Sequence, residues 1–227
     1  MKTHDSSSSH ARAIQTGILL TILCLSAGWS KHSGSRPFGG SAQKIPGRIQ
    51  CEFYDLGGEG VAYHDADAVN NGSGKLNPAD GSYLHEFRMR EGVDISFTKS
   101  GGVDDNPYNT VKPELGSLYV GWTEPGEWMN YTVDVQKDGN YKMGIRYTSN
   151  RGGAISLSIN GIDVTGPLPI RSTFVAADTV AWRQWHHWNH QDSLALIPLK
   201  KGIQVLTLHT ISEGNMNYDY LDFAFVR

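Results

Sequence analysis

Cysteine is scarce in this sequence of 227 residues, and long apolar runs are absent. The two cysteines, Cys24 and Cys51, are too few for a framework of several disulfides. The apolar run at residues 18–27 is about ten residues long, whereas a helix that crosses a bilayer needs roughly twenty. We therefore expect no transmembrane span in the mature chain.

Signatures of nucleophilic catalysis and of nucleic-acid binding are also missing. The sequence contains no G-x-S-x-G motif. Its formal net charge is −3, and its lysines and arginines form no basic stripe, so we expect no nucleic-acid partner.

The N-terminal segment has the layout of a secretory signal. Lys2 and Arg12 precede the short apolar run, and small residues follow it at positions 26–30. We predict a signal peptide at residues 1–30 and a secreted or periplasmic protein; a disordered leader with an uncleaved anchor is the alternative. Cleavage there would leave Cys51 without a partner, and the pattern around it favours a buried apolar residue.

Residues 31–47 are rich in Gly, Ser, Pro and Lys, which predicts a flexible linker. The folded domain is expected at residues 48–227. Its periodicity is that of β-strands, with alternating or β-branched and aromatic runs at residues 128–135, 141–147, 154–159, 204–209 and 221–226. Asn160-Gly161 is a strong signal for a two-residue hairpin. We therefore predict an all-β jelly-roll β-sandwich with long loop insertions at residues 72–86 and 166–192.

Two kinds of catalytic or metal chemistry remain as alternatives. The segment WHHWNH at residues 185–190 has three histidines, but no Glu or Cys ligand pattern flanks them, so a solvated loop is favoured over zinc. A glycosidase would need two carboxylates that flank a cleft. Candidates by residue type are Glu91, Asp94, Asp104, Asp105, Glu124 and Glu127, and no second motif assigns them roles.

Aromatic residues are the most informative feature, because the chain has six Trp and ten Tyr. Flat aromatic rings stack on the apolar faces of sugars, while Asn, Gln and Asp side chains pair with hydroxyls. Trp122 follows a Gly, and Trp182 lies in an irregular segment. The alternative for each Trp is packing in the core, which we expect for Trp185 and consider for Trp188.

Six motifs in order resemble family 6 carbohydrate-binding modules. They cover about residues 48–227 and read IQCEFY at 49–54, DLGGEGVAYHD at 55–65, FRMREGVDI at 87–95, VGWTEPGEWMNY at 120–131, WRQW at 182–185 and NYDYLDF at 217–223. The resemblance implies a jelly-roll sandwich that binds sugar without cleaving it. These modules usually accompany a glycoside hydrolase, which is therefore a possible partner.

The resemblance also implies site residues. A loop-end cleft would hold a sugar ring between Trp122 and Trp182, with Asn217 bonded to hydroxyls. A second, less used site on the sandwich face would involve Glu127 and Trp128. A structural calcium ion is expected to be held by family positions that correspond to Gln50, Glu52, Asp219 and the backbone carbonyl of Arg88. Oxygen atoms are the ligands that calcium prefers.

Three functional classes stay open on the sequence alone. The first is a module that binds polysaccharide or oligosaccharide. The second is a small secreted glycoside hydrolase or lyase, or the binding part of a larger enzyme. The third is a surface adhesion or assembly protein. The two long insertions depart from the family pattern and threaten to reshape or cover the loop-end cleft.

Overall fold

The computed structural model describes Met1 and residues 34–226. Apart from Met1, the predicted signal at residues 1–30 lies outside the described residues, and so does Cys24. No helix in the described part of the chain has the length and apolar character needed to cross a membrane.

Two β-sheets make up the domain, which confirms the predicted all-β sandwich. The seven-stranded sheet has the order β1-β6-β12-β8-β10, with β3 beside β6 and β9 beside β8. Its strands are β1 (Gln43–Ile45), β3 (Tyr63–His64), β6 (Trp128–Val135), β8 (Gly153–Ile159), β9 (Ile162–Asp163), β10 (Leu168–Ile170) and β12 (Gly202–Ser212).

The six-stranded sheet has the order β11-β7-β13-β5-β4, with β2 beside β13. Its strands are β2 (Gly47–Gln50), β4 (Ile95–Phe97), β5 (Leu118–Val120), β7 (Gly139–Ser149), β11 (Asn189–Leu199) and β13 (Met216–Val226). The short helical segments are η1 (Phe38–Gly40), η2 (Cys51–Phe53), η3 (Gly72–Leu76), α1 (Tyr83–Glu86) and η4 (Ala181–Trp185).

The core lies between the two sheets and follows the strand period of two. In β6, Tyr131, Val133 and Val135 are buried at alternate positions, and Leu206 of β12 lies opposite Tyr131. The other sheet contributes its own alternate residues, including Met143, Ile145, Leu221 and Phe223. The alternation read from the sequence therefore describes one face of each sheet.

The Asn160-Gly161 turn forms as its residue types predict. Both residues have positive φ, 50° and 80°, as a tight hairpin turn requires. The turn joins β8 to β9, which pair antiparallel with Ile159 opposite Ile162.

The predicted linker at residues 31–47 is wrong for its second half. Residues 43–45 form strand β1, which runs parallel to β6, and Ile45 is fully buried. Arg36 also pairs with Leu56 through two backbone hydrogen bonds. The Gly- and Ser-rich composition hid this strand, because a single apolar side chain and a long-range pairing hold it in place.

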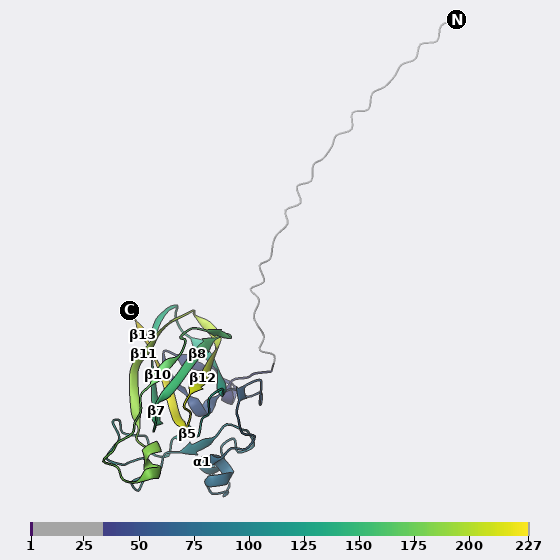
Figure 1. Ribbon diagram of the computed structural model, residues 1–227. Coiled ribbons are helices and arrows are strands. Elements are labelled where there is room, and N and C mark those ends of the chain that lie inside the picture. Colours follow the sequence, from purple (N-terminus) through teal and green to yellow (C-terminus); the bar gives the residue numbers. More distant parts are fainter. Residues whose placement is uncertain (2–33, 227) are drawn as a thin grey trace. The chain divides into compact units, whose positions relative to one another are not determined.

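The first predicted insertion and the middle of the second lie at one end of the sandwich, whereas residues 168–170 and 189–192 of the second are parts of strands β10 and β11. Figure 1 shows α1, from the first insertion, and the lime-green helical turn η4, from the second, at the end of the sheets away from the C-terminus. Cys51 is a buried free thiol, as predicted.

Candidate functional site

A cleft of about 570 Å³ opens at this loop end. Pockets that bind small ligands commonly have volumes of roughly 300–1,000 Å³. Its lining consists of Leu76, Asn77, Ser96, Lys99, Val103, Tyr119, Trp122, Trp182, Trp185, His186, Asn215 and Asn217. The three residues predicted for the sugar site, Trp122, Trp182 and Asn217, thus lie in one cleft, although they come from three separate segments.

Trp122 is held by a constrained turn after β5. Its φ is 49°, a conformation that residues other than glycine seldom adopt and that concentrates at functional sites. The turn is anchored at both sides: the N–H of Gly121 donates to the carbonyl of Asp94, and the Thr123 hydroxyl exchanges hydrogen bonds with the backbone of Met216. The Trp122 ring lies half-buried against Gly72, where an added Cβ would come within 3.2 Å of it.

Asn217 lies at the start of β13 and is 6% exposed. Its amide nitrogen donates to the Thr148 hydroxyl at 2.9 Å and to the Trp185 carbonyl at 2.8 Å. Both amide hydrogens are therefore used within the protein. The Oδ1 atom packs close to Gly121, at 2.8 Å from where a Cβ would stand, and it is the atom that remains to accept a hydrogen bond from a ligand.

Trp182 stands on η4 and is 54% exposed. Its ring meets His186 edge to face at 5.8 Å. The polar core of the loop is Asp178, which accepts two hydrogen bonds from the Arg183 guanidinium, at 2.7 and 2.8 Å, and lies 2.8 Å from Nε2 of buried His187. Chiefly because Arg183 donates to it, the pKa of the Asp178 carboxyl lies below its usual range. Internal hydrogen bonds and ion pairs thus hold the loop of the second insertion, and this loop brings Trp182 into the cleft.

We expect Asp178→Asn to weaken sugar binding several-fold, although Asp178 is outside the lining of the cleft. The substitution keeps the size of the side chain but removes the charge that orients Arg183 and His187. Hydrogen exchange of residues 175–187 should speed up in parallel with the loss of affinity measured by calorimetry. Asp192→Asn, at a side chain that is 84% exposed, is the matched control. Unchanged exchange in this loop would contradict the prediction.

Several residues of the cleft were missed by sequence reasoning. Trp185 was expected in the core, yet it is only partly buried and lines the cleft. A signal existed, because residues three apart lie on the same side of a 3-10 helix, as Trp182 and Trp185 do on η4. Trp188 is the core residue of the group: it is fully buried against Tyr119.

The histidines of residues 185–190 do not converge. His186 contacts Asp104, His187 contacts Asp178, and His190 lies between Asp192 and Asp222. Within residues 34–226, no cluster of three or more His, Cys, Asp or Glu side chains is arranged to hold a metal ion.

The carboxylates considered for glycosidase chemistry do not line the cleft either. In the part of the chain that the structure describes, the cleft lining contains no Asp or Glu. Asp104 comes nearest, but it is fully buried behind the wall. The cleft therefore offers stacking surfaces and hydrogen bonds, without the pair of carboxylates that glycoside hydrolysis uses.

The side chains of Glu127 and Trp128, the two residues expected for a second site, do not line the same groove. Trp128 lines a groove of about 290 Å³ on the face of the seven-stranded sheet, beside Asn130 and His209. Glu127 is absent from that lining. Its carboxylate instead accepts hydrogen bonds from the backbone N–H groups of Ala66 and Glu124.

Burial raises the pKa of Glu127 from 4.5 to about 7, with a further rise caused by the nearby Asp65 carboxylate. The folded protein therefore holds this proton more tightly than the unfolded chain, and the free energy of unfolding should fall as the pH rises from about 4.5 to 7. Urea denaturation at pH 5 and pH 8 measures this fall. Glu127→Gln should reduce it, and exposed Glu124→Gln should not; an equal fall in all three proteins would show that Glu127 is not its source.

A second pocket, of about 210 Å³, gathers three of the four residues expected to hold calcium. Gln50, Glu52 and Asp219 all line it. Gln50 is the last residue of β2, and Glu52 lies on the 3-10 helix η2 that follows it. Arg88 does not line this pocket, and its backbone carbonyl, the atom expected to bind calcium, accepts from the N–H of Glu91 at 3.1 Å.

The chemistry of this pocket fits a cation bound by oxygen atoms. Glu52 is 6% exposed, and its Oε2 has no hydrogen-bond partner in the structure. Burial raises the pKa of Glu52 to about 8, and the Asp219 carboxylate adds to the rise. Asp219 is paired with Arg146, whose Nε is 3.4 Å from Oδ2. The Arg146 and Arg48 guanidiniums stabilise the Asp219 carboxylate. Within residues 34–226 no Lys or Arg pairs with Glu52, so a bound cation would supply the partner that Glu52 lacks.

Fold and site together define a β-sandwich with an aromatic cleft at one loop end. A model of carbohydrate-binding module family 6 matches residues 95–227, more than half of the chain. The chain therefore belongs to this family, whose members are non-catalytic binding modules.

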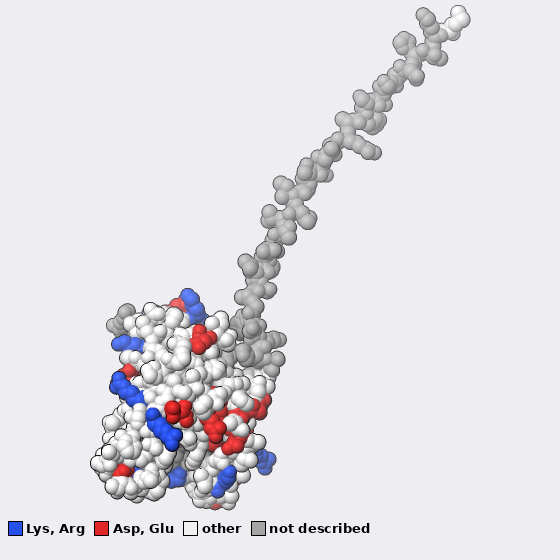
Figure 2. All heavy atoms as spheres, viewed as in Figure 1, with Lys and Arg blue, Asp and Glu red and all other residues white. Residues whose placement is uncertain are grey.

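On the face drawn in Figure 2, basic side chains are scattered and form no continuous stripe.

Solved structures show the same fold at low sequence identity. A family 6 module from Clostridium stercorarium, solved in complex with cellobiose, has a TM-score of 0.50 at 14% identity, over 82% of this chain and 99% of that one. A module from Clostridium cellulolyticum in complex with xylose has a TM-score of 0.47 at 15% identity, over 80% and 99%. No curated protein matches the chain.

Proposed function

We propose that this chain binds a polysaccharide or oligosaccharide, without cleaving it, in the loop-end cleft. One observation carries the proposal: Trp122, Trp182 and Asn217, which lie up to 95 positions apart in the sequence, line the same cleft. Two indole rings supply flat apolar surfaces for sugar rings, and Oδ1 of Asn217 accepts from a hydroxyl. Membership of the family and the sugars bound by similar modules support this function.

Calcium is proposed as a structural ion in the pocket of Gln50, Glu52 and Asp219. Bound there, it would supply positive charge where β2 and η2 meet β13, near both ends of the folded domain. We also propose that the chain is secreted or periplasmic, because calcium sites of extracellular modules commonly bind at submillimolar to millimolar concentrations. We also propose that the chain acts together with a glycoside hydrolase, which is part of the same polypeptide or of a separate one.

Affinity electrophoresis against a panel of plant and algal polysaccharides tests binding, and calorimetry with oligosaccharides measures it. We expect retardation by at least one glycan and no release of reducing ends. Release of reducing ends would identify a hydrolase, and release of unsaturated sugars a lyase. A chain that no glycan on the panel retards would contradict the proposed function.

A further inference from the structure

The charge of the cleft differs in sign from that of the whole chain. The formal net charge of the protein is −3, yet the charged and basic side chains that line the cleft are Lys99 and His186. No acidic side chain of residues 34–226 lines the cleft, so its charged and basic groups are an ammonium group and an imidazole.

Lys99 has no carboxylate partner for its ammonium group within the described residues. Its Nζ donates to the Ser96 hydroxyl at 3.0 Å and to the Phe97 carbonyl at 3.3 Å, and lies 4.2 Å from the centre of the Phe97 ring. An ammonium group has three N–H donors, so one remains for a ligand. Burial lowers the pKa of Lys99, which shows that the charge is partly desolvated where it stands.

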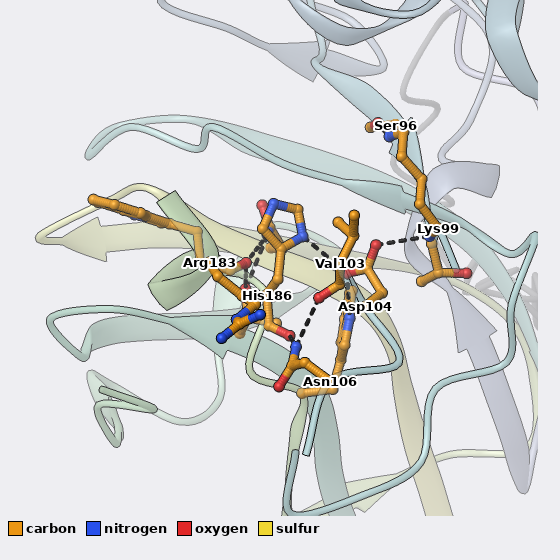
Figure 3. Close-up of polar contacts among 12 residues, drawn as sticks. Ser96, Lys99, Val103, Asp104, Asn106, Arg183 and His186 are labelled. Carbon is orange, nitrogen blue, oxygen red and sulfur yellow. Dashed lines mark hydrogen bonds and ion pairs between the residues drawn. The ribbon is translucent and has the colours of Figure 1, made fainter. Parts of the chain in front are cut away.

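Asp104, the neighbouring carboxylate, is engaged by other groups (Figure 3). Its Oδ2 accepts from the backbone N–H of Lys99 at 2.7 Å, and its Oδ1 accepts from Trp188 Nε1 at 2.7 Å and contacts His186 Nδ1 at 2.9 Å. Asp104 thereby fixes the backbone beneath Lys99 and turns Nδ1 of His186 toward the interior. The Nε2 atom is left as the ring nitrogen available to a ligand.

We propose that the ligand of this cleft is an anionic sugar, whose carboxylate or sulfate ester binds between Lys99 and His186. The inference rests on the proposed sugar-binding function of the same cleft. The hydrogen bonds of this half-buried ammonium group go only to neutral oxygens, and the charge of Asp104 offsets only part of its lost hydration. An anionic substituent would supply a charge in direct contact, with strong charge-assisted hydrogen bonds. Neutral hydroxyls would be served as well by the amides of Asn77 and Asn217, which already line the cleft.

Two pairs of polysaccharides test the proposal and separate its two chemical sources. Glucuronoxylan and its carboxyl-reduced form differ by a carboxylate, and porphyran and its solvolytically desulfated form differ by a sulfate ester. We expect the wild-type chain to bind one anionic member about tenfold more tightly than its neutral counterpart at low salt. Lys99→Gln should reduce this ratio to near one, whereas Lys142→Gln, at an exposed position on β7, should leave it unchanged. Thermal melts confirm that both variants are folded.

Each result decides between distinct conclusions. A preference for glucuronoxylan identifies a carboxylate, and one for porphyran a sulfate ester. Equal binding within both pairs overturns the anionic-sugar inference but leaves the sugar-binding function standing. Failure to bind all four and every other glycan tested overturns the function itself. Equal retention by polyaspartate, or a preference that survives in Lys99→Gln, would mean that charge elsewhere on the surface attracts polyanions, and would also overturn the inference.

Discussion

Trp122→Ala is expected to abolish measurable sugar binding while the domain stays folded. Trp122 lines the cleft and is not part of the buried core between the sheets. An aromatic anchor at the centre of a binding site typically contributes at least about 2 kcal/mol, which is roughly a thirtyfold loss of affinity on truncation. If the ring were core, its removal would instead cost about 3–5 kcal/mol of stability.

Trp182→Ala should weaken binding by a similar factor, because a sugar that stacks on two rings is open to water when either is lost. Phe174→Ala is the matched control: Phe174 belongs to the same insertion and is 56% exposed, close to the 54% of Trp182, but it is outside the lining of the cleft. Calorimetric titration and thermal melts of all three variants separate binding from folding. Wild-type affinity in Trp182→Ala, or a large loss of stability with retained binding in Trp122→Ala, would contradict the two-ring site.

The double variant adds information that the single variants lack. If Trp122 and Trp182 act on one sugar ring, their effects are coupled, and the double variant should lose less affinity than the sum of the single losses. Additive losses would mean that the two rings bind different sugar units. The cleft, at about 570 Å³, is large enough for more than one.

Strands with strong local patterns could be predicted from the sequence. β6 and β7 each begin or end within about two residues of their predicted positions, because their apolar residues alternate and turn residues separate them. β11 was missed, since its first residues are polar and a bulge between Gln191 and Ala195 interrupts its pairing with β7. Local pattern carries no signal for a strand whose alternation is broken and whose paired residues lie 42 to 60 positions away.

The residues of the candidate site also divide into those that local motifs predict and those that only the fold brings to the cleft. Trp122 and Asn217 were found because each lies in a motif that resembles the family, at residues 120–131 and 217–223. Lys99 and His186 were missed as residues of the cleft, because both depend on buried Asp104, which His186 contacts across 82 positions of sequence. Loops held by such long-range polar contacts have no periodicity, so only the folded structure shows which of their side chains face the cleft.

Calcium is expected to raise the thermal midpoint of unfolding by about 5–10 °C when its concentration is about a hundred times its dissociation constant. A ligand that binds only the folded state at that excess adds about 2.7 kcal/mol of stability. The expectation comes from Glu52, whose buried Oε2 lacks a hydrogen-bond partner and whose carboxylate lies near that of Asp219. In chelator, Glu52 must either keep its proton, with its pKa raised to about 8, or bury a charge that no Lys or Arg of residues 34–226 pairs with, whereas Asp219 lies near Arg146 and Arg48.

Glu52→Gln should therefore have opposite effects in the two conditions. In chelator the variant should be at least as stable as the wild type, because a neutral amide costs less to bury than an unpaired carboxylate. In calcium it should be less stable, because it has lost a charged ligand. Glu124→Gln, at an exposed position, should follow the wild type in both.

Melts in chelator and in calcium measure the midpoints, and mass spectrometry of the purified protein measures bound metal. If the wild-type midpoint is the same in both conditions and no metal is found, Glu52 is a buried acid without a cation, and the proposed calcium site is wrong.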